Sequence, residues 1–211
     1  MKVVVIGAAG RTGRLVVGRA LADGHRVIAV VRHPETMPVE HPDCVVVRGD
    51  VLKPETLVDP LAAAEAVFYL AAEPGRATSV TRSFGMAHVV DLVRDSGGTA
   101  RVFAVSPSAI DVSASASLWR RLSVRMVIDK VLRNRFLDHE RTEDELRNGG
   151  VSWTVVRVRG LIDGPAGRYR TEVGNHIAGE RPVSRGDLAD FLVKALTDPD
   201  LRDRVVSLSG D

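Results

Sequence analysis

Short apolar runs alternate along the chain with longer stretches in which apolar residues recur at helical spacing. The short runs predict buried strands at Val3–Ile6, Val27–Val31, Val45–Val47, Ala66–Leu70, Arg101–Ser106, Trp153–Val158 and Arg204–Leu208. The longer stretches predict helices over Thr12–Ala22, Pro54–Ala63, Thr78–Asp95, Leu118–Asn148 and Asp187–Leu196. Strands of this apolar kind that alternate with helices are typical of a parallel sheet covered on both faces. The pattern predicts an α/β fold with a doubly wound parallel sheet in Rossmann order, formed by a single domain over residues 1–211.

Composition and net charge limit the kinds of molecule that the protein is expected to bind. The 211 residues are 45% hydrophobic and 27% charged, with a net charge of only +2, which is typical of an ordinary globular protein and argues against nucleic-acid or membrane binding. No apolar run approaches the roughly 18 residues of a membrane span, and no signal-peptide pattern is present. The single cysteine, Cys44, excludes an intramolecular disulfide, so we expect a cytoplasmic protein. We expect Cys44 itself to be a buried strand residue.

Three glycines follow the first predicted strand directly, in the stretch VVVIGAAGRTGRLVV. They match G-x-x-G-x-x-G between a strand and a helix, which is the context that dinucleotide binding requires. Gly7 would permit a tight turn, Gly10 would let backbone N–H groups approach a pyrophosphate, and Gly13 would let the helix pack closely. The helix N-terminus would supply N–H donors and partial positive charge. A glycine-rich turn without a ligand is the weaker alternative.

The residues after the second strand bear on the choice of cofactor. An acidic residue there would favour NAD, whereas this chain has Arg32 and no carboxylate before Glu35. The guanidinium of Arg32, helped by Arg11, can pair with the 2′-phosphate of NADPH. The prediction is therefore NADPH, with NADH bound at lower affinity. A merely solvated Arg32 is the alternative.

The ends of the next two strands offer further candidate cofactor contacts. Asp50 and Val51 follow the third strand, where a carboxylate and nearby backbone would reach the adenine. Asp50 could equally cap the predicted helix region at Pro54. Ala71 and Ala72 end the fourth strand, and their small side chains would leave room for the inner ribose of the cofactor.

Stretches along nearly the whole chain resemble the atypical short-chain dehydrogenase/reductases of the NAD(P)H-binding, NmrA-like kind. The stretches are VVVIGAAGRTGRLVV, VIAVVRHPETMP, VVVRGDVLKPETL, AEAVFYLAAEPG, RVFAVSPSAI, DHERTEDELRNGGVSWTVVRVRGLID, GRYRT and VSRGDLADFLVKAL. The branch of biliverdin-IXβ and flavin reductases is the most similar. The resemblance implies a Rossmann core with a small C-terminal substrate-facing part. It also implies NADPH contacts at Gly7, Gly10, Arg11, Thr12, Gly13, Arg32 and Asp50.

The chain departs from the Tyr-x-x-x-Lys pair that ordinary members of the superfamily use for proton transfer. Its only tyrosines, Tyr69 and Tyr169, do not precede a lysine by four residues. Alignment with the family places Arg135 and His139 at the two positions. Because the flavin and biliverdin reductase branch departs in the same way, the resemblance implies direct hydride transfer to a planar conjugated acceptor such as a flavin, a quinone or a biliverdin-like molecule.

Two residues are the candidate catalytic groups. Ser106 ends the fifth strand and corresponds to the family's active-site serine, which implies a hydrogen bond to the substrate or the nicotinamide; Ser108 lies two residues on. A turn residue before Pro107 is the alternative for Ser106. His139 could supply a proton, or could be a solvated residue on a charged helix.

Other features leave alternatives open. The basic stretch from Ser113 to Arg135 could be a solvated helix face or a lid over an acidic planar substrate. Arg157 and Arg159 could line a substrate pocket or pair with Asp163, and Ser184 could cap the last helix.

Several other chemistries find no support in the sequence. No metal-ligand pattern, no G-x-S-x-G elbow and no P-loop ending is present, so the sequence predicts no metal site, hydrolase or kinase-type loop. A non-catalytic NADP(H)-binding sensor is the alternative to the reductase. We expect a monomer, with a dimer left open.

Overall fold

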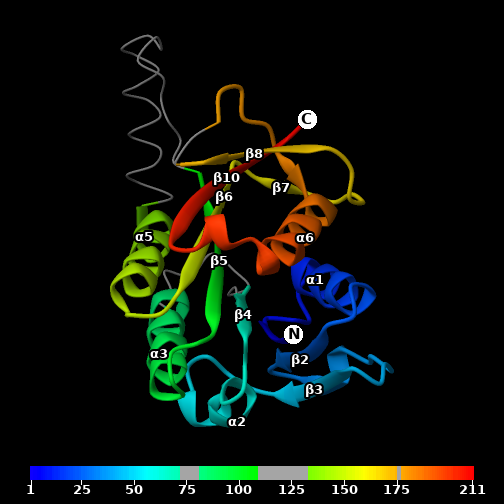
Figure 1. Ribbon diagram of the computed structural model, residues 1–211, viewed down its shortest axis with the longest axis vertical. Helices are drawn as coiled ribbons and strands as arrows, with labels where there is room; N and C mark the ends of the chain where they lie inside the picture. The colour runs from blue at the N-terminus through cyan, green and yellow to red at the C-terminus, as the bar shows by residue number, and fades with distance from the viewer. Residues whose placement is uncertain (72–80, 109–132, 175–176) are drawn as a thin grey trace.

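The computed structural model describes residues 1–71, 81–108, 133–174 and 177–211. Its eight-stranded sheet has the order β3-β2-β1-β4-β5-β6-β10-β8, which confirms the predicted Rossmann arrangement (Figure 1). The strands, in the order of the sheet, are β3 (Cys44–Arg48), β2 (Arg26–Val31), β1 (Lys2–Ile6), β4 (Ala66–Tyr69), β5 (Arg101–Pro107), β6 (Trp153–Val158), β10 (Arg204–Gly210) and β8 (Tyr169–Val173). All neighbouring pairs are parallel except β10 with β8, which are antiparallel.

Helices cover both faces of this sheet. Figure 1 shows α1 (Arg11–Ala22) and α6 (Arg185–Lys194) on one side, and α3 (Thr81–Asp95) and α5 (Arg133–Asn148) on the other. Alternate strand residues enter two separate cores because successive side chains of a strand point to opposite faces. Val3 and Val5 of β1 thus pack on the side of α1 and α6, whereas Val4 and Ile6 pack on the side of α3. Burial on both faces explains the near-continuous Val and Ile runs of the strands.

The structure corrects the helix predicted over Pro54–Ala63. A 3₁₀ turn, η2 (Pro54–Thr56), precedes a four-residue helix, α2 (Val58–Leu61). Pro60 explains the break: it has no N–H to donate to the carbonyl of Thr56, and its ring would crowd that carbonyl in a continuous helix. Residues 118–132 of the long helix predicted over Leu118–Asn148 lie outside the described residues, and the remainder forms α5. The predicted start of the preceding helix at Thr78 also lies outside them.

Three strands were not predicted from the sequence. The edge strand β8 has mostly exposed side chains, and β7 (Leu161–Ile162) and β9 (Val183–Ser184) form a separate two-residue pair. Besides η2, the chain forms two 3₁₀ turns that lead from α6 into β10, η4 (Ala195–Thr197) and η5 (Pro199–Leu201). Another 3₁₀ turn, η1 (Pro34–Thr36), follows β2. The sheet is therefore parallel, as predicted, except at its edge, where β8 runs antiparallel to β10.

The register of the sheet brings the carboxyl ends of its central strands to one edge. Ile6, Tyr69 and Ala104 are paired across β1, β4 and β5, and Ser106 is paired with Arg157 of β6. The glycine turn, the end of β4 and Ser106 therefore meet where ligands bind in open α/β sheets. Within the described ranges no helix is long and apolar enough to span a bilayer. The same ranges hold no cluster of three or more potential metal ligands.

Candidate cofactor and substrate site

Two of the three motif glycines are required by close backbone packing. Gly7 has φ +83°, and a Cβ there would lie 2.7 Å from the carbonyl oxygen of Leu70, at the end of β4. A Cβ on Gly13 would lie 2.3 Å from the carbonyl oxygen of Gly7 and 2.8 Å from Cα of Ala8. Gly7 therefore allows the tight turn and Gly13 the close approach of α1, as the sequence pattern predicts.

The start of α1 lies open beside this turn. Gly10 is the exposed N-cap residue, so no side chain caps the helix, and the first turn contains no acidic residue. The first turn comprises Arg11, Thr12 and Gly13, so none of its own side chains neutralises its partial positive charge. Gly10 has no side chain that could cover the N–H groups of this turn, and this glycine cradle fits the pyrophosphate of a dinucleotide.

Arg14 joins the glycine turn to the segment after β2. Its Nε donates to the carbonyl oxygen of Ala9 at 3.0 Å, and its Nη2 donates to that of Thr36. Arg32, directly after β2, is exposed and forms no hydrogen bond or ion pair with the described part of the chain. Its guanidinium is therefore available to an anion that binds at the end of β2.

The carboxylate of Glu35, three residues after Arg32, interacts with its own turn. Glu35 pairs with His33 at 3.3 Å. A backbone hydrogen bond within its own turn, followed by the charges of His33 and Arg48, lowers the pKa of Glu35.

Asp50 caps a local turn. Its Oδ1 accepts a hydrogen bond from the N–H of Leu52 at 3.0 Å, and its carbonyl oxygen accepts one from the N–H of Lys53 at 2.8 Å. Asp50 thus closes the turn before Pro54, whereas the N-cap residue of the Pro54 segment is Lys53, which forms no side-chain cap. Val51 is buried against α3, and its carbonyl oxygen is 2.8 Å from Nδ1 of His88.

Ala71 is half-buried beyond the end of β4, and its carbonyl oxygen accepts a hydrogen bond from Nε of Arg82 at 3.3 Å. Ala72, which the sequence also predicts as a cofactor contact, lies outside the described residues.

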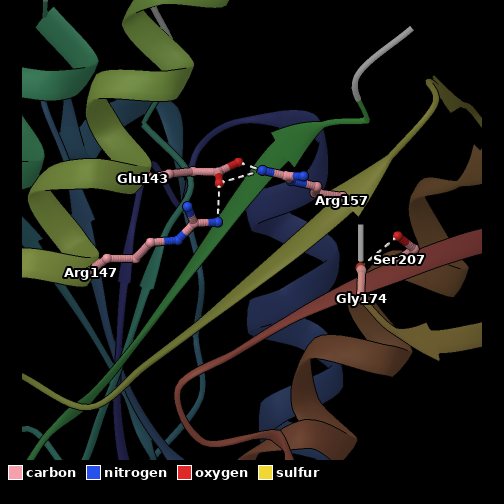
Figure 2. Close-up of polar contacts among 5 residues, drawn as sticks. All are labelled: Glu143, Arg147, Arg157, Gly174 and Ser207. Carbon is pink, nitrogen blue, oxygen red and sulfur yellow. Dashed lines mark hydrogen bonds and ion pairs between the residues drawn. The ribbon is translucent and has the colours of Figure 1, made fainter. Parts of the chain in front are cut away.

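Ser106 is only 5% exposed and is the first of three polar residues that are neighbours across β5, β6 and β10. Its register partner on β6 is Arg157, and the partner of Arg157 on β10 is Ser207. Register partners share a face, and this row faces α5. Ser207 Oγ donates to the carbonyl oxygen of Gly174 at 3.0 Å (Figure 2).

The Arg157 guanidinium is fixed by a buried carboxylate from α5. Figure 2 shows Glu143 between Arg157 and Arg147. Glu143 Oε1 is 3.2 Å from Nε of Arg157, and Oε2 is 2.7 Å from its Nη2 and 2.8 Å from Nη2 of Arg147. The bidentate pair ties α5 to β6 beside Ser106. One expectation from the sequence was that Arg157 pairs with Asp163. In the structure Asp163 pairs instead with Arg11 at 3.3 Å and with Arg185 at 2.6 Å.

His139 lies on α5 beside α3. Nη1 of Arg82 lies 3.0 Å from its Nδ1 and also contacts its Nε2. His139 therefore lies against Arg82, and its assignment as a proton donor stays a prediction. Arg135 also belongs to α5, while the basic stretch before residue 133 lies outside the described residues.

Both tyrosines of the chain are committed to structural hydrogen bonds. Tyr69 is buried and its hydroxyl donates to the carbonyl oxygen of Arg82 at 2.8 Å. The Tyr169 hydroxyl donates to Oδ2 of Asp190 at 2.8 Å. Burial raises the pKa of both phenols, and for Tyr169 the hydrogen bond and negative charge of Asp190 raise it further. Both phenols therefore keep their protons at neutral pH.

One buried acidic residue near this edge was not singled out from the sequence. Glu180 accepts a hydrogen bond from Oγ of Ser108, and both residues are buried. Glu180 lies between β8 and β9, and its partner is 72 positions away in the chain. No local pattern signals such a contact. Ser184, by contrast, caps α6 as predicted, with its Oγ 2.9 Å from the N–H of Asp187.

Comparisons with known proteins agree with this geometry. A family model described as NAD(P)H-binding matches residues 7–199. The photosystem II assembly factor Ycf39 of Synechocystis sp. is 27% identical over 207 residues, which are 93% of this chain. The chain spans 58% of the length of that relative.

Solved structures share the fold over almost the whole chain. A protein from Lactobacillus casei has a TM-score of 0.83 at 21% identity, and the match covers 99% of each chain. The anaerobillin reductase ChuY from Escherichia coli O157:H7 has a TM-score of 0.76 at 20% identity, over 99% of this chain and 97% of ChuY. A short-chain dehydrogenase/reductase from Veillonella parvula, in complex with NADP, has a TM-score of 0.78 at 15% identity, over 99% and 94%.

Proposed function

We propose that this chain, which belongs to the NAD(P)H-binding family, is an NADPH-dependent reductase of planar conjugated acceptors such as flavins, quinones or biliverdin-like molecules. The bound cofactor would supply a hydride, and the protein would hold cofactor and acceptor in contact. The residues proposed to hold the cofactor are Gly7, Gly10, Arg11, Thr12, Gly13, Arg32, Asp50, Val51, Ala71, Ala72 and Ser106.

The observation that carries the proposal is the glycine turn at the start of α1 together with the exposed guanidinium of Arg32 after the neighbouring strand β2. The cradle leaves the first turn of α1 without a side-chain cap. Arg32, which has no hydrogen bond or ion pair among the described residues, follows β2 directly, where the 2′-phosphate would distinguish NADPH from NADH. Arg14 fixes the glycine turn to the segment that follows Arg32, and so supports a defined geometry for that subsite.

The raised pKa values and the structural hydrogen bonds of the two tyrosines support the preference for a conjugated acceptor. Alcohol dehydrogenation in this superfamily needs a phenol that exchanges a proton near neutrality. Tyr69 and Tyr169 have raised pKa values and structural partners. Reduction of a flavin or quinone places fewer demands on the protein, because the acceptor takes a hydride directly. Ser106, buried beside the fixed Arg157, would orient the acceptor or the nicotinamide by one hydrogen bond.

Cofactor preference is tested by the dissociation constants of NADPH and NADH at low salt. A charged hydrogen bond to phosphate contributes about 1.5–3 kcal/mol, which is roughly a 10- to 100-fold preference for NADPH. Arg32→Ala should remove this preference and leave NADH binding unchanged. Arg26→Ala is the matched control, because Arg26 is exposed at the opposite end of the same strand. Equal constants in the wild-type protein would contradict the assignment.

Catalysis is tested by NADPH oxidation with FMN, riboflavin, a naphthoquinone and biliverdin as separate acceptors. The reductase proposal expects turnover of at least one acceptor and a loss of turnover in Ser106→Ala. Ser96→Ala, an exposed serine beyond the end of α3, should have no effect. Tight NADPH binding with no turnover of any acceptor would replace this proposal by a cofactor sensor.

A further inference from the structure

Arg48, the last residue of β3, lies beside the end of β2. Its register partner on β2 is Val31, the residue directly before Arg32. The pairing continues one residue further, because the N–H of Gly49 donates to the carbonyl oxygen of Val31 at 2.9 Å. Neighbouring strands lie about 4.8 Å apart. The main chain of Arg48 is therefore held one strand away from that of Arg32, although the two residues are distant in the sequence.

The Arg48 side chain is exposed and lies on the α1 face of the sheet. Val31 belongs to the core on that face, and Val46, two residues before Arg48, packs against the same core. Register partners share a face, so Arg48 lies on this face too. The pKa of Glu35 on η1 is lowered first by a backbone hydrogen bond and then by the charges of His33 and Arg48. The Arg48 guanidinium is thus close enough to η1 to interact with it.

Arginines from three elements surround the segment that follows β2. Arg32 precedes η1 in the chain, and Arg48 approaches η1 from β3. Arg14 of α1 donates through Nη2 to the carbonyl oxygen of Thr36, the last residue of η1. Glu35 is the one carboxylate in residues 32–37. The three cations therefore outnumber the acidic group of this segment, and their combined field would attract an anion of more than one charge.

We propose that Arg48 is a second cation of the 2′-phosphate subsite, beside Arg32, and so helps to determine the preference for NADPH over NADH. This inference rests on the proposed function, which puts the 2′-phosphate at the end of β2. A phosphate monoester carries almost two negative charges at neutral pH and has three strong acceptor oxygens. One guanidinium neutralises only part of that charge, whereas two from neighbouring strands bind the phosphate from two sides. NADH has a hydroxyl group at this position and gains nothing from Arg48.

The test measures binding of adenosine 2′,5′-bisphosphate and of adenosine 5′-monophosphate by calorimetry at low salt. The two probes differ only in the 2′-phosphate, and neither requires turnover. Loss of a charged hydrogen bond to phosphate lowers affinity about 10- to 100-fold. We expect a loss of this size for the bisphosphate in Arg48→Gln, with binding of the monophosphate unchanged, and the same contrast between NADPH and NADH. Arg26→Gln is the matched control, because Arg26 is exposed at the opposite end of the β2–β3 pair.

Further variants separate a direct contact from an effect through Glu35. If Arg48 did no more than neutralise the Glu35 carboxylate, Arg48→Gln would have no effect once Glu35→Gln is present. We expect the same loss of bisphosphate affinity in the Glu35→Gln background. Arg48→Lys, which keeps the charge, should retain part of the affinity that Arg48→Gln loses. Because Arg48 is exposed, each of its variants should unfold at the temperature of the wild-type protein.

The outcomes separate this inference from the proposed function. An equal loss for both probes, or a loss that disappears in the Glu35→Gln background, would overturn the direct contact between Arg48 and the phosphate. Unchanged bisphosphate affinity in Arg48→Gln would also overturn it, and a loss in Arg32→Ala alone would leave the proposed NADPH subsite standing. A wild-type protein that binds the two probes equally would overturn both the role of Arg48 and the proposed cofactor preference.

Discussion

Replacement of Gly13 by alanine should push α1 away from the turn that follows β1. The new Cβ would lie 2.3 Å from the carbonyl oxygen of Gly7, where ordinary contact begins at 3.4 Å. The helix must move by about 1 Å, because the obstructing atoms, which belong to Gly7 and Ala8, are all backbone atoms and no side chain can rotate away. Overpacking of this kind costs about 1–3 kcal/mol, and it displaces the N–H groups proposed to bind the pyrophosphate.

The assay is urea unfolding together with NADPH titration. Gly13→Ala should lower the free energy of unfolding by about 1–3 kcal/mol and weaken NADPH binding at least tenfold. Gly18→Ala is the matched control in the same helix, because no atom lies within 4 Å of its added Cβ. It should raise the free energy of unfolding by about 0.5–1 kcal/mol through helix propensity, and leave NADPH binding unchanged. A Gly13→Ala protein with wild-type stability and affinity would refute the packing argument.

Three other perturbations have defined outcomes. Arg101→Ala should lower the free energy of unfolding by about 2–4 kcal/mol in urea, since its buried guanidinium donates to two carbonyls beyond the end of α6. Ser184→Ala should cost about 1 kcal/mol in the same assay through the lost cap. Burial raises the pKa of Asp190, but hydrogen bonds from Lys194 and Tyr169 outweigh it and lower the pKa overall. Its stabilising effect is thus present at neutral pH and lost in acid, so the stability difference from Asp190→Asn should shrink below about pH 4.

The central parallel strands could be predicted from the sequence because they are buried on both faces, whereas β3, at the edge of the sheet, is only partly buried. Their apolar character is continuous, and each is followed by a glycine or a helical pattern. The edge strand β8 has no such signal, since its stretch YRTEV is mostly exposed. It forms because β10 offers backbone partners more than thirty residues along the chain. Local patterns do not encode a pairing of that kind.

In the candidate site, too, some features could be predicted from the sequence and others could not. The roles of Gly7 and Gly13 depend on local chain geometry, and the sequence predicts them. Asp50 was ambiguous because the same carboxylate suits a ligand or a turn, and the structure places it in the turn. The pairs Glu143 with Arg157 and Ser108 with Glu180 join residues that only the tertiary fold brings together.

The most direct test of the central claim is NADPH oxidation by a naphthoquinone, measured with ordinary NADPH and with NADPH deuterated at the transferred position of C4. The reductase account predicts turnover that is slower with the deuterated cofactor, because the hydride passes directly to the acceptor held at the carboxyl edge of the sheet. NADPH that binds tightly yet stays reduced in the presence of this and every other acceptor would contradict the account.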